Sequence, residues 1–390
     1  MYKKTIITIL LVSVCSAIYA QNTGTGAVLL NRLRALQNRG VLIGHQDDAL
    51  YGSTWKYEHG RSDVLEICGD FPAVMGFDIG RIELASDKNL DGVPFNIMRR
   101  EICAQHERGG IVTLSWHPCN PATGKNHRDL TGNPVKNVLK KRGDVRRTFD
   151  QWLDRLADFL FSLKDSNGRL VPVIFRPWHE MTGDWFWWGT KSCTPDQYKQ
   201  LFVYTYRYLK AKGLDNIVWC YSPGSSSKET EQRFMAYYPG DAYVDVIGVD
   251  IYDTAKRKDF IGDVQRELRI MSKVAREHNK LFALTETGYK SNPEKDWYTD
   301  KLLPAISEYQ PLYVLLWRND WNMKSEVYGP APDRKQASDF RKFHQNPLTL
   351  FVKDIRQKRQ TAVPATSQPT PNVPATQPVE EINLNNLIHK

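Results

Sequence analysis

The sequence predicts an α/β fold, a (β/α)₈ TIM barrel, as one domain over residues 21–355. Three observations lead to this prediction. Between residues 41 and 320, eight short apolar runs alternate with longer amphipathic stretches, most runs end in polar or aromatic residues, and no Gly-x-Gly-x-x-Gly turn follows any run. Eight strand–helix units favour a closed barrel. A doubly wound open sheet is the alternative, but it usually carries an early glycine-rich phosphate turn.

The eight apolar runs are typical of strands that are buried on both faces. The stretches between them carry apolar residues at the spacing i, i+3, i+4 and i+7, which predicts amphipathic helices. The predicted strands are residues 41–46, 71–79, 110–118, 170–180, 216–223, 244–253, 280–288 and 313–320, and the clearest predicted helices are 148–164, 195–213 and 264–280.

The predicted strands end in "GHQ", "FDIG", "WHP", "RPWHE", "YSP", "DIYD", "TETG" and "WRND". One strand alone can end in a polar residue simply to meet water. In a parallel barrel, however, the carboxyl ends of the strands and the loops that follow them build the active site on one face. Eight polar and aromatic ends in one sequence therefore predict a functional site on that face.

Both ends of the chain differ from the predicted barrel. Residues 1–20 combine two lysines, a short apolar stretch and a small residue before Gln21, which is the pattern of a secretory signal peptide. A lipoprotein signal that uses Cys15 is the alternative, and the large Val14 before it disfavours this interpretation. We therefore expect export to the periplasm or the medium. Residues 359–390, rich in Pro, Thr and Gln and without aromatics, predict a disordered tail.

The composition disfavours several other classes of function. The formal net charge is +9, or +7 once the two lysines of residues 1–20 are removed, and basic residues cluster only at 136–147. This pattern predicts a solvated face and no nucleic acid partner. The cysteines beyond Cys15 are irregularly spaced, which disfavours a zinc site and leaves one or two disulfides open. We expect no metal, no cofactor, no membrane span and a monomer.

Glu180 and Glu286 follow the fourth and seventh predicted strands, which face each other across a barrel of eight. Two carboxyl groups there could lie about 5–5.5 Å apart, the spacing of a retaining glycosidase. Glu180 lies among tryptophans, and an apolar surrounding favours the neutral acid, so Glu180 is the candidate acid/base. Glu286 has two threonine neighbours that could hydrogen-bond an anion, so it is the candidate nucleophile. A structural ion pair is the alternative for either glutamate alone.

Three segments resemble glycoside hydrolase family 26, the β-mannanases of clan A. They are "RPWHEMTGDWFWWG" (176–189), "LTETGY" (284–289) and "LLWRN" (315–319). The resemblance covers roughly residues 25–350. It implies a retaining β-1,4-mannanase, endo-acting or mannobiose-releasing, whose acid/base and nucleophile are the two glutamates already singled out.

The resemblance also implies residues around the cleaved bond. Trp116 and His117 match the family pair that contacts the sugar at the cleavage subsite. His179 is expected to hydrogen-bond on the nucleophile side of the site. Asp250 and Tyr252 match the positions that orient the nucleophile, and a tyrosine O–H directed at that carboxylate would stabilise its anion.

Further along the substrate, the resemblance implies stacking and polar contacts. Trp185 is expected to stack on the leaving-group sugar, Trp317 to form a stacking platform, and Arg318 to make a more remote contact on the glycone side. A pyranose has an apolar face that packs on indole, while its hydroxyls form hydrogen bonds at the rim.

Other residues of these segments have structural expectations. We expect Trp178 to face the core and Asp184 to lie in a surface loop. Arg176 and Asp78 could pair beneath the site. For the tryptophans at 187 and 188, packing and binding both remain open.

The expected substrate is mannan, glucomannan or galactomannan. A different β-glycan, mixed-linkage β-glucan or β-1,3-xylan, is an alternative within the same family. A non-catalytic carbohydrate-binding protein is disfavoured, because binding alone does not need an opposed carboxylate pair. The long polar loop at 119–146 is expected to narrow one end of the cleft and to favour short products.

Overall fold

The computed structural model describes residues 24–226, 228, 230–323 and 325–356. The expected signal peptide, residues 1–20, and the expected tail, residues 359–390, lie outside the described residues and stay predictions. Within the described part of the chain, no helix has the length and apolar character needed to cross a membrane.

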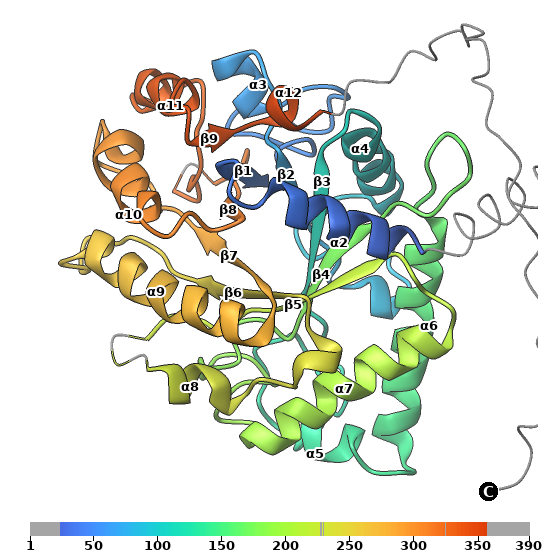
Figure 1. Cartoon of the computed structure of the whole chain (residues 1–390). Helices are drawn as coiled ribbons and strands as arrows, with labels where there is room; N and C mark the ends of the chain where they lie inside the picture. The colour runs from blue at the N-terminus through green and yellow to red at the C-terminus, as the bar shows by residue number, and fades with distance from the viewer. Residues whose placement is uncertain (1–23, 227, 229, 324, 357–390) are drawn as a thin grey trace, which may run out of the picture. The chain divides into compact units, whose positions relative to one another are not determined.

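Eight parallel strands close into a barrel, as predicted (Figure 1). Each strand pairs with the next along the chain, and β1 pairs with both β2 and β8, which closes the ring. The short β9 pairs with the start of β1 from outside the ring. The strands are β1 Val41–Gln46, β2 Val74–Asp78, β3 Ile111–Trp116, β4 Val173–Pro177, β5 Ile217–Tyr221, β6 Val246–Asp250, β7 Leu281–Thr287, β8 Tyr313–Leu316 and β9 Thr349–Leu350.

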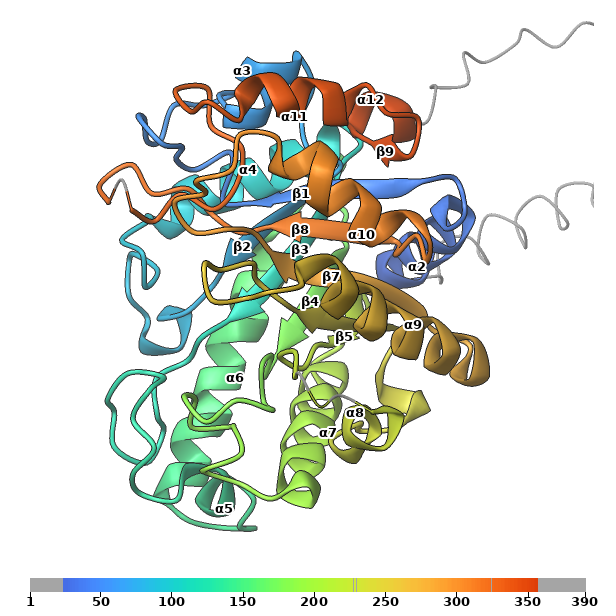
Figure 2. The ribbon, with the colours of Figure 1, turned by 90° about the vertical axis from the view of Figure 1, so that its left-hand side faces the viewer.

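Helices surround the strands, and the three predicted from periodicity are confirmed as α6, α7 and α9 (Figures 1 and 2). The loop expected at 119–146 contains the short helix α5. The helices are α2 Thr25–Leu36, α3 Asp63–Cys68, α4 Phe95–Glu107, α5 Pro134–Val138, α6 Asp144–Ser162, α7 Pro195–Ala211, α8 Glu231–Ala236, α9 Phe260–His278, α10 Leu303–Ser307, α11 Ala337–His344 and α12 Val352–Ile355, with shorter turns η1 Ile82–Leu84, η2 Asp241–Tyr243 and η3 Tyr298–Leu302.

Alternate strand residues pack on opposite sides of the barrel wall, as the two-residue period of a strand requires. In β1, Leu42 packs in one cluster, whereas Val41 and Ile43 pack with the helices in another. The first cluster lies inside the barrel, because it joins residues from every strand of the ring without any from α4, α6, α7 or α9, and three leucines of α2 close it at one end. Its strand members include Leu42, Val74, Ile111, Ile174, Val218, Val246, Leu281 and Tyr313.

The five cysteines of the described chain are all free, so the disulfides left open by the sequence are not formed there.

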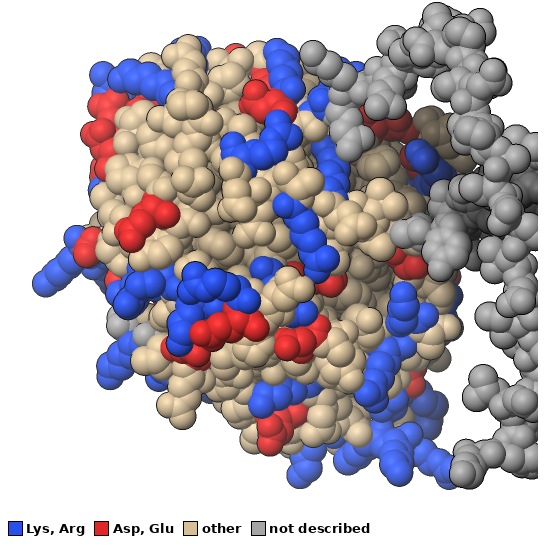
Figure 3. Space-filling view, viewed as in Figure 1, with Lys and Arg blue, Asp and Glu red and all other residues tan. Residues whose placement is uncertain are grey.

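The basic cluster at residues 136–147 contains two ion pairs on α6. Arg146 pairs with Asp150, and Arg147 pairs with Asp144. Figure 3 shows Lys and Arg spread over one face with Asp and Glu between them. This distribution fits a solvated face.

Candidate active site

Glu180 follows β4 at a sharp turn of the backbone. Trp178 and Glu180 have φ values of 59° and 54°, in the left-handed region that residues with side chains rarely adopt. The Glu180 N–H donates a 2.8 Å hydrogen bond to the carbonyl oxygen of Ser222, just after β5. The Tyr198 hydroxyl donates to the carbonyl oxygen of Trp178 at 3.1 Å. These contacts hold a strained turn of the kind that clusters at functional sites.

An extra residue in β7 sets the direction of Glu286. Residues 249 and 250 of β6 pair with residues 284 and 286 of β7, so Thr285 is extra, and the pairing with β8 shifts over the same segment. Such a bulge re-aims the side chain that follows it. Gly248 of β6 makes room for the bulge, because a Cβ there would lie within 3.0 Å of the Thr285 hydroxyl.

The two glutamates come together at the carboxyl ends of β4 and β7. Glu180, Asp250 and Glu286 each offer a carboxylate oxygen, and these oxygens lie within 4.8 Å of one another. Retaining glycosidases hold their two carboxyl groups about 5–5.5 Å apart, whereas inverting enzymes leave about 6.5–9.5 Å for a water molecule. The spacing therefore fits direct attack by a carboxylate on a sugar carbon.

Glu286 is buried and receives two strong donors. The Arg176 guanidinium contacts one carboxylate oxygen, and the Tyr252 hydroxyl donates a 2.6 Å hydrogen bond to the other, as expected for Tyr252. The same guanidinium donates to both oxygens of Asp250 at 3.0 and 3.1 Å. Burial and the charge of Asp250 raise the pKa of Glu286 to about 8, while Arg176 and Tyr252 oppose this rise. Asp250 thus acts on Glu286 through the shared arginine.

Two contacts expected near Glu286 are absent from the described structure. Thr285 donates its hydroxyl to Asp250 at 2.6 Å instead of to Glu286. The expected pair of Arg176 with Asp78 is wrong, because Arg176 reaches across the barrel to acids of β6 and β7 while Asp78 pairs with His117.

Glu180 is half-buried and has a weaker set of donors. The Trp185 indole N–H donates a 2.9 Å hydrogen bond to its Oε2. Loss of bulk water raises the pKa of Glu180 to about 8, and the charges of Glu286 and Asp250 add to the rise. Because a cation and a hydroxyl stabilise the Glu286 anion, Glu286 loses the first proton of the pair and Glu180 keeps its own near neutral pH.

Three histidines meet beside the carboxylates. His117 Nδ1 lies 2.6 Å from Asp78 Oδ2, His117 Nε2 lies 3.0 Å from His179 Nε2, and the His127 ring centre lies 5.1 Å from that of His117. Burial opposes the charge on His117, but Asp78 raises its pKa. Burial and the charge of His117 lower the pKa of His179, and they lower that of His127 to about 4.

His117 is therefore the protonated member of this group and His179 a neutral one. The expected hydrogen bond from His179 to the nucleophile side is not formed. His179 contacts His117 instead, because the turn after β4 places its ring edge-on to the His117 ring at 4.4 Å between centres. His127 was missed by the sequence reasoning, since it lies inside a polar loop with no motif around it.

Several tryptophans near the site are buried and support it. Trp116 has no exposed surface and donates its indole N–H to Glu83 at 3.1 Å, so the expectation that it contacts the sugar is wrong. Trp187 is fully buried, and its backbone N–H donates to the carbonyl oxygen of His127, which ties down the loop after β3. Trp188 is also buried and donates to the carbonyl oxygen of residue 179. Both are packing residues.

Other side chains at the rim remain accessible. Trp185 is 38% exposed, and Trp317 and Arg318 are half-buried directly after β8. Arg318 pairs with Asp320 at 2.9 Å and with Asp91 at 3.4 Å. These three residues are therefore available to a ligand, as expected for sugar contacts.

The remaining expectations can be placed as well. Trp178 is fully buried, as predicted. Asp184 lies on the surface in an ion pair with Lys191 at 2.5 Å, also as predicted. Ser222 was not singled out from the sequence, yet its hydroxyl donates to Asp250 at 2.9 Å and accepts from Arg176. Only its position at a strand end could have indicated this role.

Glu180, Asp250 and Glu286 are also the only grouping of three or more metal-ligating side chains among the described residues. The Arg176 guanidinium already contacts two of these carboxylates. Its positive charge stands where a cation would be needed, so the group does not fit a metal site.

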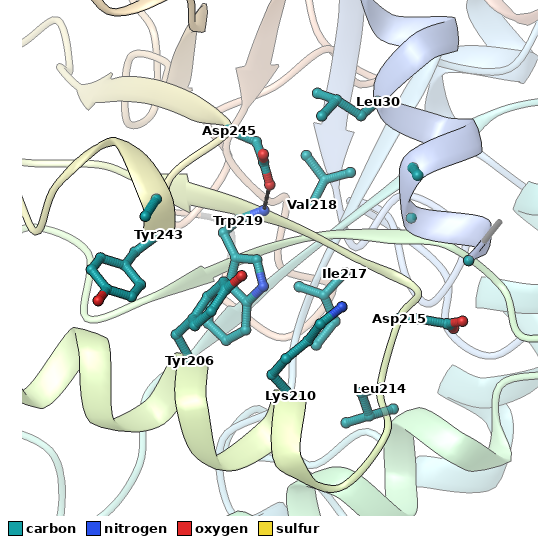
Figure 4. A pocket seen from close by; sticks show the side chains of 14 residues that line it. Leu30, Tyr206, Lys210, Leu214, Asp215, Ile217, Val218, Trp219, Tyr243 and Asp245 are labelled. Carbon is teal, nitrogen blue, oxygen red and sulfur yellow. Dashed lines mark hydrogen bonds between the residues drawn. The ribbon is translucent and has the colours of Figure 1, made fainter. Parts of the chain in front are cut away.

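Two cavities lie at opposite ends of the barrel. One, of about 530 Å³, adjoins His117 and is lined by residues of the loops after β2 and β3, among them Arg81 and His127. The other, of about 220 Å³, lies at the start of β5 (Figure 4), where Trp219 and Asp245 line it. In TIM barrels the face at the N-terminal ends of the strands, where this second cavity lies, contributes to the stability of the fold and carries no active site.

Comparisons with known proteins agree with this geometry. Residues 18–350 match the model of glycosyl hydrolase family 26. The chain is 36% identical over 279 residues to a mannan endo-1,4-beta-mannosidase of Bifidobacterium adolescentis, covering 66% of this chain but only 28% of that relative. It is 30% identical over 318 residues to the Bacillus subtilis enzyme of the same name, covering 76% of this chain and 80% of the relative.

A solved structure is similar over nearly its whole length. A GH26 β-mannanase from Bacteroides ovatus superposes with a TM-score of 0.82 at 41% identity, covering 87% of this chain and 99% of that chain. The barrel, the pair of glutamates on β4 and β7, and the family match over most of the chain agree. This chain is a member of glycosyl hydrolase family 26.

Proposed function

We propose that this protein is a retaining β-mannanase, which hydrolyses β-1,4-mannosidic bonds in mannan, glucomannan or galactomannan. The observation that carries the proposal is the pair of glutamates, close enough for direct attack and in unlike surroundings. The names of the relatives, mannan endo-1,4-beta-mannosidase and β-mannanase, support the choice of substrate.

In the first step the ionised Glu286 attacks the anomeric carbon while Glu180 gives its proton to the leaving glycosidic oxygen. Arg176 and Tyr252 hold the attacking carboxylate in place. The indole N–H of Trp185 occupies Oε2 of Glu180, so the transferable proton sits on the other oxygen, Oε1. The bond to the leaving sugar breaks as the ester to Glu286 forms.

In the second step Glu180, now ionised, removes a proton from a water molecule, which attacks the same anomeric carbon. The ester to Glu286 breaks and the carboxylate returns. Once the covalent ester has removed the charge of Glu286, the pKa of Glu180 falls, because its main charged neighbour is gone. The same residue can therefore act first as an acid and then as a base.

The accessible residues around the pair bind the chain of sugars. Trp185 stacks on the leaving-group sugar, Trp317 forms the platform on the other side of the cleaved bond, and Arg318 contacts the glycone further away. His117, held protonated by Asp78 through its Nδ1–H, presents its ring to the sugar at the cleavage point. The other ring nitrogen of His117, Nε2, contacts Nε2 of His179, and this contact keeps the His117 ring in position.

Purified protein assayed on linear mannan, mixed-linkage β-glucan and β-1,3-xylan tests the substrate. The proposal expects the highest kcat/KM on mannan, and a higher value on either other glycan would replace mannan by that glycan.

The variants Glu180→Ala and Glu286→Ala test the mechanism. Each is expected to lose about 100- to 10,000-fold in kcat on mannan. In the first, azide is expected to raise turnover of a dinitrophenyl β-mannobioside, whose leaving group needs no acid, by attacking the ester in place of water. Binding without catalysis by the wild type would instead support a carbohydrate-binding protein. Asp184→Ala is the control, since this surface residue lies in the same segment and should keep full activity.

We also propose that the chain is exported by residues 1–20. Mass spectrometry of the protein recovered from cells of its source should find a chain that begins at Gln21. A lipid attached to Cys15 would replace this proposal by membrane anchoring.

A further inference from the structure

The Trp185 indole rests directly on the backbone of Gly183. A Cβ added at Gly183 would lie less than 3.0 Å from three atoms of the six-membered indole ring, Cζ2, Cζ3 and Cη2. Gly183 does not have a positive φ, so its backbone would accept other residues. Space for the indole is therefore the reason why a glycine is needed at this position.

Hydrogen bonds fix Gly183 on both sides. Its N–H donates to the carbonyl oxygen of Glu180 at 2.9 Å. Its own carbonyl oxygen accepts from the backbone N–H of Thr190 at 2.9 Å and from the Thr190 hydroxyl at 3.0 Å. The surface beneath the indole is thus rigidly connected to the acid/base residue three positions earlier.

The orientation of the indole has two chemical consequences. Its N–H reaches Oε2 of Glu180, and 38% of the Trp185 side chain stays exposed although one ring face is covered by Gly183. An indole in this place can hydrogen-bond the acid and still offer surface to the leaving-group sugar. A side chain at position 183 would displace the ring from both the Glu180 carboxyl and the leaving-group sugar.

We propose that Gly183 is a positioning residue, which seats the Trp185 indole so that it aligns the proton of Glu180 and binds the sugar on the leaving-group side. This inference rests on the proposed function and adds to it a residue that does not itself touch the substrate. The exposed indole can move without disturbing the buried core, so Gly183→Ala should still fold.

Gly183→Ala, compared with the wild type on mannopentaose and on 2,4-dinitrophenyl β-mannobioside, tests the proposal. Dinitrophenolate leaves without a proton and has no sugar to stack. For mannopentaose the variant should lose at least about tenfold in kcat/KM, whereas kcat/KM for the dinitrophenyl substrate should stay within about twofold. An equal loss on both substrates, or no loss on mannopentaose, would overturn the proposal.

The pH profile gives a second readout that a merely structural role would not move. The Trp185 N–H stabilises the Glu180 anion, so losing it raises the pKa of Glu180. The alkaline limb of kcat/KM for mannopentaose should therefore move to higher pH in Gly183→Ala. An unmoved limb contradicts the assignment.

A double-mutant cycle keeps the test valid if Gly183→Ala is poorly stable. In a Trp185→Ala background no indole remains to be displaced, so Gly183→Ala should have no further effect on kcat/KM. Additive losses would mean that Gly183 acts by another route. Gly224→Ala is the matched control: a Cβ there would lie 3.7 Å from the Cβ of Glu180, an ordinary contact, and activity should be unchanged.

A wild type that is inactive on mannopentaose would count against the proposed substrate alone. The comparison of Gly183→Ala with the wild type is then made on an oligosaccharide of whichever β-glycan the wild type cleaves, with the same two outcomes.

Discussion

Arg176 is the residue on which the geometry of the site depends most. Its guanidinium is buried and bridges Asp250 and Glu286, two acids from neighbouring strands. Buried carboxylates that lose their only cation are left with an uncompensated charge, which costs more than the ion pair itself contributes.

We therefore expect Arg176→Met to lower the free energy of unfolding by about 3–5 kcal/mol near neutral pH. Urea unfolding measures this loss. Arg147→Met is the control, because the pair of Arg147 with Asp144 is exposed and such pairs contribute about 0–1 kcal/mol. Similar losses in the two variants would contradict the role of Arg176.

Tyr252 acts on the ionisation of Glu286, the proposed nucleophile. Its hydroxyl donates to Glu286 and lowers the pKa of that carboxyl against the effect of burial. In the proposed mechanism activity needs the Glu286 anion, so activity rises as pH increases through this pKa. In Tyr252→Phe the pKa rises, and the acidic limb of kcat/KM should move to higher pH. An acidic limb that stays in place would show that the hydroxyl has no influence on Glu286.

At the scale of elements, the aromatic segment after β4 combines two kinds of tryptophan. Trp187 is fully buried and ties the loop after β3 to this segment, whereas Trp185 is accessible and contacts Glu180. The sequence alone could not separate them, because four tryptophans within eleven residues from Trp178 to Trp188 carry no period that distinguishes packing from binding.

Alanine variants should separate the two roles. Trp187→Ala should lower the free energy of unfolding by about 3–5 kcal/mol, because it leaves a cavity and an unpaired carbonyl oxygen at Pro118. Trp185→Ala should keep nearly wild-type stability and lose activity on mannopentaose. Thermal unfolding measures the stability of each variant, and kcat/KM on mannopentaose measures its activity. A loss of stability that is larger for Trp185→Ala would reverse the assignment.

The strands and their polar ends could be predicted because continuous apolar runs and their boundaries are written directly in the order of residues. The bulge at Thr285 could not, since one extra residue in β7 changes neither the apolar run nor its end. For this reason the sequence indicated that Glu286 belongs to the site and, through the family resemblance, that Tyr252 donates to it, but it suggested threonine donors where the structure has Arg176.

For the whole molecule, the predicted barrel explains why the site could be assembled at all. Strands four and seven lie three places apart around a closed ring of eight, so two glutamates more than a hundred positions apart in sequence meet across one end of the barrel. Partners within the barrel were harder to predict. Arg176 and Asp78 both face into the barrel, but the sequence does not specify which acid the guanidinium reaches. The family resemblance matches Trp116 to a sugar contact, whereas its indole packs on the outer side of the barrel wall against Glu83.

In the proposed mechanism Glu286 attacks the sugar while Glu180 supplies the proton. Incubation with a 2-deoxy-2-fluoro-mannosyl fluoride, followed by peptic digestion and mass spectrometry, tests it most directly. The electronegative fluorine slows both steps, and the fluoride leaving group needs no acid, so the covalent ester accumulates. The double-displacement mechanism predicts one labelled peptide with the sugar on Glu286. Label on another residue, or no label in a protein that cleaves mannan, would contradict it.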